Sequence, residues 1–510
     1  MLAIINSCAV LGMNAFQVKV EVDVSTGMPA FDIVGLPDAS VKESRERVRT
    51  AIKNSGFEFP MRRITVNLAP ADIKKEGAIF DLPIACGILL ATGQLLAPQR
   101  AENTLVAGEL SLDGTLRNIR GVLPMAAAAE TQGLTNFVLP LCNGQEAALA
   151  NTCMVYGVEH LRQFAAWWNG EEEICPMTVD VDKLLAADET TYGLDMAEVK
   201  GQEAVKRAME IAAAGGHNIL LVGSPGSGKT MLARRMPSIL PDLTLQESLE
   251  ITRIYSIAGE LPQDKPLITK RPFRAPHHSA SAASIIGGGR IPKPGEVSLS
   301  HHGVLFLDEM PEFPRDVLEA LRQPLEDKVV TISRVHGKME YAASFQLIGA
   351  MNPCPCGYYG DLLKPCTCTP NQINRYLSRI SGPLLDRIDM QVNVQRVNYE
   401  DMKNRTPGES SAVIKKRVMA AREIQRQRLQ ADHLFCNADM GRKQLQKWCQ
   451  LTKEAELLLQ DIFQKMHLSA RSYDRLLKIA RTIADLAGQE QIGLEHIAEA
   501  VQYRSMVMQS

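Results

Sequence analysis

The chain has almost no excess charge of either sign. Its 510 residues carry 56 Lys and Arg against 58 Asp and Glu, a formal net charge of −2. A protein that attracts nucleic acid over much of its surface carries a basic patch or a strong basic excess. Any nucleic-acid contact of this chain therefore has to be local, in a pore or a patch.

Long hydrophobic runs are also missing. No stretch approaches the roughly 18 consecutive apolar residues of a membrane-spanning helix. Residues 1–6 lack the basic segment and long apolar core of a secretory signal peptide. The 11 cysteines do not make a disulfide framework in a chain of this length. We therefore expect a cytoplasmic protein without a membrane partner.

The first third of the chain predicts one α/β domain, residues 1–168. Residues 18–24 alternate apolar and polar side chains with period two, as in a half-buried strand, and residues 41–54 carry apolar residues at helical spacing. Further short β-rich runs and alanine-rich helical patterns follow. An acidic, irregular stretch, residues 169–192, predicts a linker to the next domain.

A phosphate-binding loop is the strongest motif. An apolar run at 219–222 predicts a buried strand, and residues 231–235 predict a helix after the loop. Glycines in this context let backbone N–H groups surround a phosphate at a helix N-terminus, while the lysine reaches the β- and γ-phosphates and the threonine hydroxyl ligates Mg²⁺. The predicted nucleotide-binding residues are Gly223, Ser224, Pro225, Gly226, Ser227, Gly228, Lys229 and Thr230.

Two later strands supply the other groups that nucleotide hydrolysis needs. The apolar run 303–307 ends in Asp308 and Glu309, which predicts a holder for Mg²⁺ and a base for the attacking water. The run 345–351 ends in Asn352, a candidate to orient that water. The alternative for Asn352 is a turn residue before Pro353.

Two segments of the same region are harder to interpret. Residues 272–300, with two histidine pairs in or near them, predict a flexible inserted loop that meets a polymer or a partner. Two cysteine pairs follow Asn352 and could close a tetrahedral Zn²⁺ site, although each pair is closer than the usual spacing of roughly two to four residues. The alternative is reduced thiols in a loop. These cysteines are Cys354, Cys356, Cys366 and Cys368.

One arginine that precedes the C-terminal part of the chain is a further candidate site residue. Arg387 is a candidate to reach a neighbouring subunit's γ-phosphate, because a guanidinium offsets the charge that develops there. The alternative is a surface pair with Asp386.

The last part of the chain predicts helices from about residue 411 to 503 and is basic in places. Residues 415–428 carry six basic side chains against one acid, which could contact a phosphate backbone or form a solvated helix face.

The motifs together resemble a known family. Residues 193–510 are similar to the Mg-chelatase-like branch of AAA+ ATPases, and the whole chain resembles the ComM/YifB proteins. In AAA+ proteins a segment like Val199-Lys200-Gly201-Gln202 lies beside the adenine. The alternative for this segment is an ordinary helix N-terminus. Arg471, at the start of a predicted helix, resembles the lid arginine that senses the γ-phosphate, with Arg475 as the alternative.

The N-terminal region resembles the Lon-protease-type domain of ComM/YifB proteins, a ribosomal S5 domain 2-like α+β fold. The matching stretches are 33–37, 66–72, 80–85 and 108–111. Lon-type proteases use a serine–lysine dyad. Ile79 stands where the serine is expected, and residues 119–123 contain no lysine. A nucleophile and its base are both missing, so we expect a scaffold or binding module.

The resemblance implies an AAA+ core at 193–398, with the insert and the cysteine loop 354–368, and a helical lid at 399–510. It also implies ATP and Mg²⁺ as cofactors, a homo-oligomeric ring (a hexamer), and a DNA motor for branch migration in transformation, with recombination proteins as partners. Two alternatives stay open: a chelatase motor subunit, and an ATP-dependent protease or protein-remodelling ATPase without DNA activity.

Overall fold

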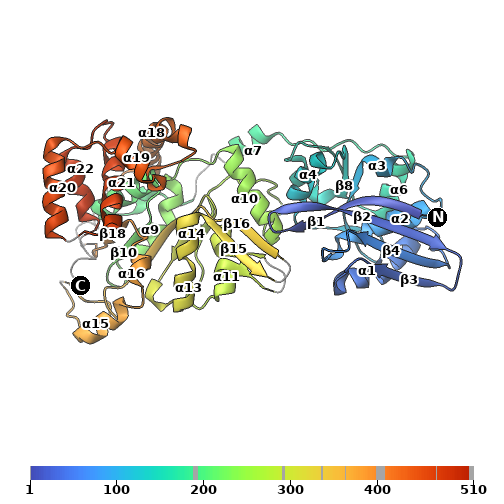
Figure 1. The fold of residues 1–510 in the computed structure, drawn as a ribbon, viewed down its shortest axis with the longest axis horizontal. Helices are drawn as coiled ribbons and strands as arrows, with labels where there is room; N and C mark the ends of the chain where they lie inside the picture. The colour runs from blue at the N-terminus through green and yellow to red at the C-terminus, as the bar shows by residue number, and fades with distance from the viewer. Residues whose placement is uncertain are drawn as a thin grey trace. The chain divides into compact units, whose positions relative to one another are not determined.

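The computed structural model describes residues 2–187, 193–262, 264–289, 293–334, 337–361, 363–397, 408–466 and 468–504. It contains two compact units (Figure 1). Unit 1 comprises residues 1–187, 245–269 and 333–341, and unit 2 comprises 188–244, 270–332 and 342–510. Residues 188–192 of the predicted linker and 398–407 around the predicted lid boundary lie outside the described part.

The two units interleave along the chain in a way that differs from the predicted domains. Residues 245–269 and 333–341 fall in the predicted ATPase core, but they cluster with unit 1. Helix α10 (Leu245–Ala258) belongs to this group, and the Ser256 hydroxyl on it donates to the Glu146 carboxylate of the same unit. The sheet core and the helical lid, predicted as separate domains, share unit 2.

Unit 1 is built on a mixed seven-stranded sheet in the order β3-β4-β2-β1-β5-β8-β9. β1 and β2 form an antiparallel hairpin, and the strands from β1 through β9 on the other side run parallel. The predicted alternation at 18–24 is present, because Val18, Val20, Val22 and Val24 are all buried. The strands are β1 (Leu2–Leu11), β2 (Asn14–Ser25), β3 (Ala30–Val34), β4 (Arg63–Ala69), β5 (Thr104–Val106), β8 (Asn136–Pro140) and β9 (Met154–Val158).

Helix α2 (Asp81–Ala91) is the central helix of unit 1, and every one of its residues is buried. It can approach the sheet closely because Gly87 has no side chain: a Cβ there would lie 2.4 Å from Val22 Cγ2. The other elements of the unit are α1 (Ala39–Asn54), η1 (Ala78–Phe80), α3 (Arg100–Asn103), β6 (Glu109–Leu110), β7 (Leu116–Arg117), α4 (Val122–Thr131), η2 (Leu141–Asn143), α5 (Gly144–Ala148), α6 (Leu161–Asn169) and α7 (Val181–Ala187).

Unit 2 is built on a parallel five-stranded sheet in the order β11-β14-β17-β10-β18. The inner strands are buried along almost their whole length, as expected when helices cover both faces of a parallel sheet. The strands are β10 (Ile219–Val222), β11 (Phe273–Arg274), β14 (Val304–Leu307), β17 (Gln346–Met351) and β18 (Met390–Asn393).

The helices of unit 2 share one hydrophobic core with its sheet. Ile219 on β10 and Ile483 on α21 belong to the same buried cluster. The predicted insert 272–300 is not simply a flexible loop, since its described residues include α11, α12 and the β12–β13 pair. These elements are η3 (Met196–Glu198), α8 (Glu203–Gly215), α9 (Lys229–Arg235), η4 (Met236–Ile239), α11 (Ala282–Ile286), β12 (Gly287–Gly288), β13 (Lys293–Pro294), α12 (Glu296–Leu299), η5 (Met310–Glu312), α13 (Arg315–Ala320), α14 (Arg322–Asp327), α15 (Pro370–Leu377), α16 (Gly382–Leu385), α18 (Ser411–Leu429), η6 (Gln430–Asp432), η7 (Asn437–Asp439), α19 (Arg442–Trp448), α20 (Lys453–Lys465), α21 (Ala470–Leu486) and α22 (Leu494–Gln502). A further two-stranded sheet consists of β15 (Val329–Arg334) and β16 (Gly337–Ala342).

A buried histidine makes the stability of unit 2 sensitive to acid. His217 is fully buried, and its Nε2 lies 2.8 Å from the Thr482 hydroxyl on α21. Burial lowers the pKa of His217 from 6.5 to about 4, although the nearby Asp389 carboxylate opposes the shift. The unfolded chain therefore takes up this proton first, and the stabilisation present above about pH 6.5 is lost as the pH falls towards 4.

We expect the free energy of unfolding to decrease by about 1 kcal/mol between about pH 7.5 and about pH 5.5 through His217 alone. Urea unfolding followed by circular dichroism at the two pH values measures this change. His217→Asn keeps a hydrogen-bonding side chain and does not titrate, so its pH dependence should be smaller by the same amount. An unchanged pH dependence in His217→Asn would assign the acid sensitivity to other groups.

The predicted fold class is confirmed. The chain is a mixed α/β protein with a parallel-sheet core in unit 2 and a helical C-terminal region. Among the residues described, no helix combines the length and the apolar character needed to cross a bilayer.

Candidate nucleotide site

The strand order of unit 2 brings the predicted motifs to one edge of the sheet. β10, β17 and β14 are neighbours and run parallel, so their carboxyl ends meet at the same edge. The phosphate-binding loop follows β10, Asp308 and Glu309 follow β14, and Asn352 follows β17. The outer ends of parallel strands are where α/β folds bind ligands.

The phosphate-binding loop, Gly223–Thr230, has the backbone that its sequence predicts. Gly226 and Gly228 have φ values of +78° and +91°, a region that favours glycine, and α9 begins at Lys229. A Cβ on Gly223 would lie 2.3 Å from the Val394 carbonyl oxygen, so the loop could not pass this close with any other residue there. The loop therefore places a helix N-terminus and its N–H groups at the sheet edge.

Lys229 lies between the loop and Asn352. Its Nζ donates to the carbonyl oxygens of Gly223 at 2.7 Å and Ser224 at 3.1 Å, and to Asn352 Oδ1 at 3.2 Å. Burial lowers the pKa of the Lys229 ammonium, and the charges of Asp308 and Glu309 partly oppose this shift. Lys229, which follows β10, and Asn352, which follows β17, are thus in direct contact.

Thr230 contacts Asp308, the first residue of the acid pair. The Thr230 hydroxyl donates to Asp308 Oδ2 at 2.7 Å, so the two oxygen ligands predicted for Mg²⁺ are neighbours. Glu309 has a left-handed backbone, with φ +50°, which is uncommon for a residue with a side chain. Its carboxylate lies 3.5 Å from Nδ1 of His278, measured from Oε2.

His278 is a contact that sequence reasoning missed. Its ring lies against the ring of His277, and its Nδ1 lies near the Glu309 carboxylate. The order β11-β14 explains the contact. The chain leaves β11 at Arg274 and passes beside the end of β14, where Glu309 lies.

Two more side chains on the phosphate-binding loop were not in the predicted site. The Gln202 amide donates to the Ser227 carbonyl oxygen at 2.7 Å, which brings the Val199–Gln202 segment to the loop. Arg396, just after β18, donates to Ser224 Oγ at 3.3 Å. In the described part of the chain, Gln202 Oε1 and Ser227 Oγ are buried without a hydrogen-bond partner. Buried polar atoms in this state are usually satisfied by water or a ligand.

The two predicted arginines lie near one carboxylate, that of Glu326. Arg387, only 7% exposed, forms an ion pair of 2.5 Å with Glu326 and donates to the Pro383 carbonyl oxygen. Arg387 lowers the pKa of Glu326, and Arg471 adds a smaller effect of the same sign. The suggested alternative, Arg475, instead pairs with Asp389 at 3.3 Å. Arg387 and Arg471 therefore both stabilise the charged form of the Glu326 carboxylate.

The basic helix α18 has little free positive charge. Five of its six basic side chains contact groups of unit 2, and most of these partners are acidic. For residues 415–428 this favours the alternative, a solvated helix face, over contact with a phosphate backbone. The five are Lys415 with Asp242, Arg417 with Glu210 and Glu409, Arg422 with the Ala213 carbonyl, Arg426 with Glu423, and Arg428 with Asp485.

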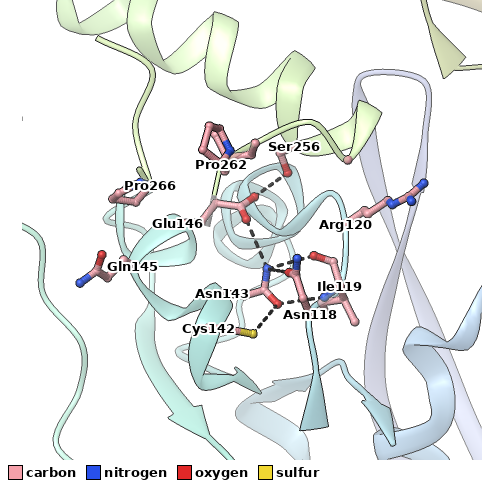
Figure 2. A pocket seen from close by; sticks show the side chains of 12 residues that line it. Asn118, Ile119, Arg120, Cys142, Asn143, Gln145, Glu146, Ser256, Pro262 and Pro266 are labelled. Atoms are coloured by element: carbon pink, nitrogen blue, oxygen red, sulfur yellow. Dashed lines mark hydrogen bonds between the residues drawn. The ribbon is translucent and has the colours of Figure 1, made fainter. Parts of the chain in front are cut away.

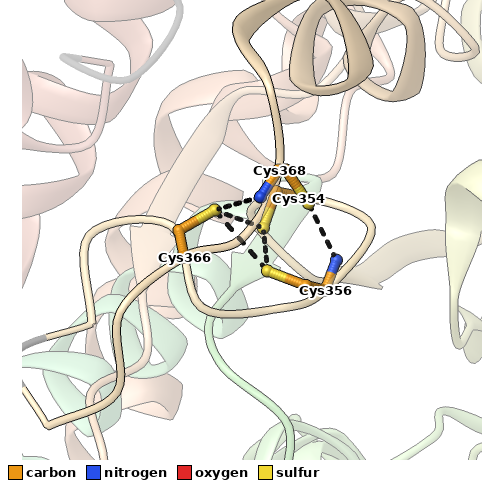
Figure 3. A group of neighbouring side chains, drawn as sticks. All are labelled: Cys354, Cys356, Cys366 and Cys368. Carbon is orange, nitrogen blue, oxygen red and sulfur yellow. Dashed lines mark hydrogen bonds between the residues drawn. The ribbon is translucent and has the colours of Figure 1, made fainter.

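The four clustered cysteines converge on one another. Their sulfur atoms all lie within 4.8 Å of one another (Figure 3). The loop that carries them starts directly after Asn352, and therefore lies beside the nucleotide site.

In unit 1 the position expected for a protease serine is hydrophobic. Ile79 lies on η1 immediately before α2 and is half-buried. The segment expected to supply the lysine lines a cavity of about 230 Å³ (Figure 2). Beside that cavity, Glu146 accepts hydrogen bonds from the Ser256 hydroxyl and, at 3.4 Å, from the Asn143 amide. Burial raises the pKa of the Glu146 carboxyl.

Comparison with known sequences agrees with the class that the sheet and the loop define, a P-loop protein of the AAA+ type. A family described as magnesium chelatase, subunit ChlI, matches residues 195–402, and the C-terminal family of the same subunit matches 408–504. A further family, described as subunit ChlI of Mg-chelatase, matches residues 20–143.

Full-length relatives define the family more narrowly. The competence protein ComM of Haemophilus influenzae is 44% identical over 509 residues, covering 99% of this chain and 98% of ComM. YifB of Escherichia coli is 44% identical over 510 residues, covering 99% of this chain and 97% of YifB. The chain belongs to the ComM/YifB family of Mg-chelatase-like AAA+ proteins. Lon protease 2 of Bacillus subtilis is 28% identical over 160 residues, or 28% of each chain.

Proposed function

We propose that this protein is an ATP-hydrolysing ring motor that acts on DNA. The observation that carries the proposal is the convergence of Lys229, Thr230, Asp308, Glu309 and Asn352 at one edge of a parallel sheet. The name of the Haemophilus influenzae relative, a competence protein, supports DNA as the substrate and recombination during transformation as the process. The proposed location is the cytoplasm, with recombination proteins as partners.

The residues at the sheet edge fit ATP and Mg²⁺. Lys229 and the N-terminus of α9 would hold the phosphates, and the unpartnered Gln202 Oε1 and Ser227 Oγ leave polar atoms for a ligand. Thr230 and Asp308 would hold Mg²⁺, which prefers oxygen ligands of this kind. Bound Mg²⁺ supplies positive charge that neutralises the phosphate oxygens.

Hydrolysis would then depend on two side chains that reach the attacking water. Glu309 is exposed enough to meet it and would take its proton, while Asn352 would orient it. The contact between Asn352 Oδ1 and Lys229 Nζ supports this role, because it places the amide beside the group expected to hold the γ-phosphate.

A second subunit would complete the site. Arg387 and Arg471 lie near the same carboxylate, Glu326, so one face of a subunit would present both to the nucleotide of its neighbour. A head-to-tail contact of this kind closes into a ring when its rotation allows. We propose a homohexamer on this basis and on the family resemblance.

The contact of His278 with Glu309 predicts a restraint on hydrolysis. A carboxylate engaged by an imidazole is less available to take a proton from water. We expect His278→Ala to raise the basal rate of ATP hydrolysis about two- to fivefold, the effect of a weak exposed pair of less than about 1 kcal/mol. The dissociation constant for ATP should stay unchanged. A steady-state ATPase assay with His277→Ala as the matched control measures this, and an equal effect of both variants would contradict it.

The DNA substrate is tested by ATP hydrolysis with and without single-stranded or forked DNA, together with strand displacement. We expect DNA to stimulate hydrolysis and the forked substrate to be unwound only with ATP. Lys229→Ala, which should not bind ATP, is the control for contaminating helicase. Equal hydrolysis with and without DNA, and no displaced strand, would overturn the DNA motor.

A chelatase motor subunit is the second candidate, and the matched family descriptions favour it. ChlI families match the N-terminal region, residues 20–143, as well as residues 195–402 and 408–504. Stimulation of ATP hydrolysis by a porphyrin-binding partner subunit, in the absence of DNA stimulation, would favour the chelatase function.

A further inference from the structure

The cysteine loop contains four thiols arranged around one point (Figure 3). Cys354 Sγ lies 3.3 Å from Cys356 Sγ and 3.6 Å from Cys366 Sγ, and the last two are 3.5 Å apart. Cys368 joins them, because its Sγ accepts a hydrogen bond of 3.3 Å from the Cys356 backbone N–H. The Cys368 N–H in turn donates to Cys366 Sγ at 3.4 Å.

These separations fit a single tetrahedral metal ion. Four sulfur ligands at about 2.3 Å from a Zn²⁺ ion lie roughly 3.8 Å from one another. A disulfide would bring one pair to about 2.0 Å and leave the others outside the cluster. With all four sulfurs within 4.8 Å, the cluster has room for one ion and not for several irons.

Regular secondary structure does not fix the shape of the described part of the loop. Its described residues, 353–361 and 363–369, form turns and bends but neither helix nor strand. Fixing the backbone of each residue costs roughly 1–2 kcal/mol in conformational entropy. Cys354 is buried and the other three cysteines are half-buried, so a central ion rather than a hydrophobic core would connect the two ends of the loop.

The same loop packs on the phosphate-binding loop. Gly357 has φ +83°, and a Cβ there would lie 2.6 Å from Pro225 Cδ, so the contact requires glycine. Arg396 connects the two loops: its guanidinium lies 3.6 Å from the Asp361 carboxylate and donates to Ser224 Oγ. The Arg396 guanidinium also lies 5.6 Å from the centre of the Tyr358 ring.

We propose that Cys354, Cys356, Cys366 and Cys368 bind one structural Zn²⁺, and that the ion holds the loop against the phosphate-binding loop in the geometry that binds nucleotide. The metal site requires only the arrangement of the four sulfurs. Its effect on nucleotide rests on the proposed ATPase function, and the two parts are measured separately.

The metal is tested by elemental analysis of the purified full-length protein. We expect about one zinc per chain after dialysis, and loss of most of it in Cys356→Ser and in Cys366→Ser. Cys175→Ser, which removes an exposed thiol outside the cluster, is the control and should keep its zinc. Iron in place of zinc, or the same low zinc content in all four proteins, would overturn the site.

The coupling is tested by the affinity for a fluorescent ATP analogue. We expect Cys356→Ser and Cys366→Ser to raise its Kd about tenfold, equivalent to about 1.4 kcal/mol. Gly357→Ala should also raise the Kd while the protein keeps its zinc, which separates the contact from the metal and from misfolding. Loss of zinc with an unchanged Kd would overturn the coupling. If the wild-type protein binds zinc but no nucleotide, the proposed ATPase function fails and the metal site stands.

Discussion

Glu309→Gln should lower the rate of ATP hydrolysis about 10²- to 10⁴-fold, the range for removal of a general base. The amide keeps the size of the side chain, and its neighbours Lys229, Thr230 and Asp308 retain their contacts. ATP should therefore bind with a nearly unchanged Kd. Single-turnover hydrolysis and equilibrium binding of a fluorescent ATP analogue measure the two quantities.

The matched control is Glu423→Gln, the same chemical change on α18 in a surface pair with Arg426. It should hydrolyse ATP at the wild-type rate. Binding lost together with hydrolysis in Glu309→Gln would indicate a structural role for the carboxylate, and a wild-type rate would refute it as the base.

Arg387→Ala should reduce hydrolysis about 10³-fold, the lower end of the effect of an arginine finger. Such a loss alone does not show that the arginine serves a neighbour. Glu309→Gln and Arg387→Ala subunits, each inactive, should regain activity when mixed. In a randomly mixed ring about a quarter of the interfaces pair an intact Glu309 with an intact Arg387.

A loss of stability is the competing explanation for reduced hydrolysis in Arg387→Ala, because Arg387 pairs with Glu326. The Glu326 side chain is 49% exposed and that of Arg387 is 8% exposed, so solvent screens the pair from the Glu326 side and the pair should contribute about 1 kcal/mol. Glu326→Gln removes the same pair and keeps Arg387, and it should retain hydrolysis. If mixing gives no recovery and Glu326→Gln is as inactive as Arg387→Ala, Arg387 holds the fold and does not act in the neighbouring site.

Local motifs were the part of the site that the sequence could predict. The glycine loop, the acid pair and Asn352 are each contiguous with the strand that carries them, and hydrophobic runs identify such strands. Knowing that these strands belong to one parallel sheet is enough to place the motifs at one edge. The contacts of Lys229 with Asn352 and of Thr230 with Asp308 agree with that placement.

Contacts between distant segments were not predictable in the same way. Arg396 is 172 residues from Ser224, and it reaches the phosphate-binding loop only because β18 is the neighbour of β10. His278 reaches Glu309 because β11 lies beside β14. Neither contact leaves a signal in the local pattern, since strand order is set by the packing of the whole unit.

Helix patterns raise a similar difficulty. Residues 245–258 fall within the predicted AAA+ core, 193–398, yet the helix that they form, α10, belongs to unit 1, because the packing of the folded chain decides which core a helix covers. The charge run at 415–428 could have been free or paired. Its ion-pair partners, such as Glu210 and Asp485, lie far away in sequence, so only the fold shows that the charges are neutralised.

The sequence by itself predicted the AAA+ family, the fold class and the candidate groups around a γ-phosphate. Tertiary structure decided which residues surround those groups. It placed His278 beside Glu309, and Arg396 and Gly357 against the phosphate-binding loop. It also brought Arg387 and Arg471 within electrostatic range of Glu326. The physical reason is that a motif needs only its own strand and loop, whereas its environment depends on strand order and on packing across the unit.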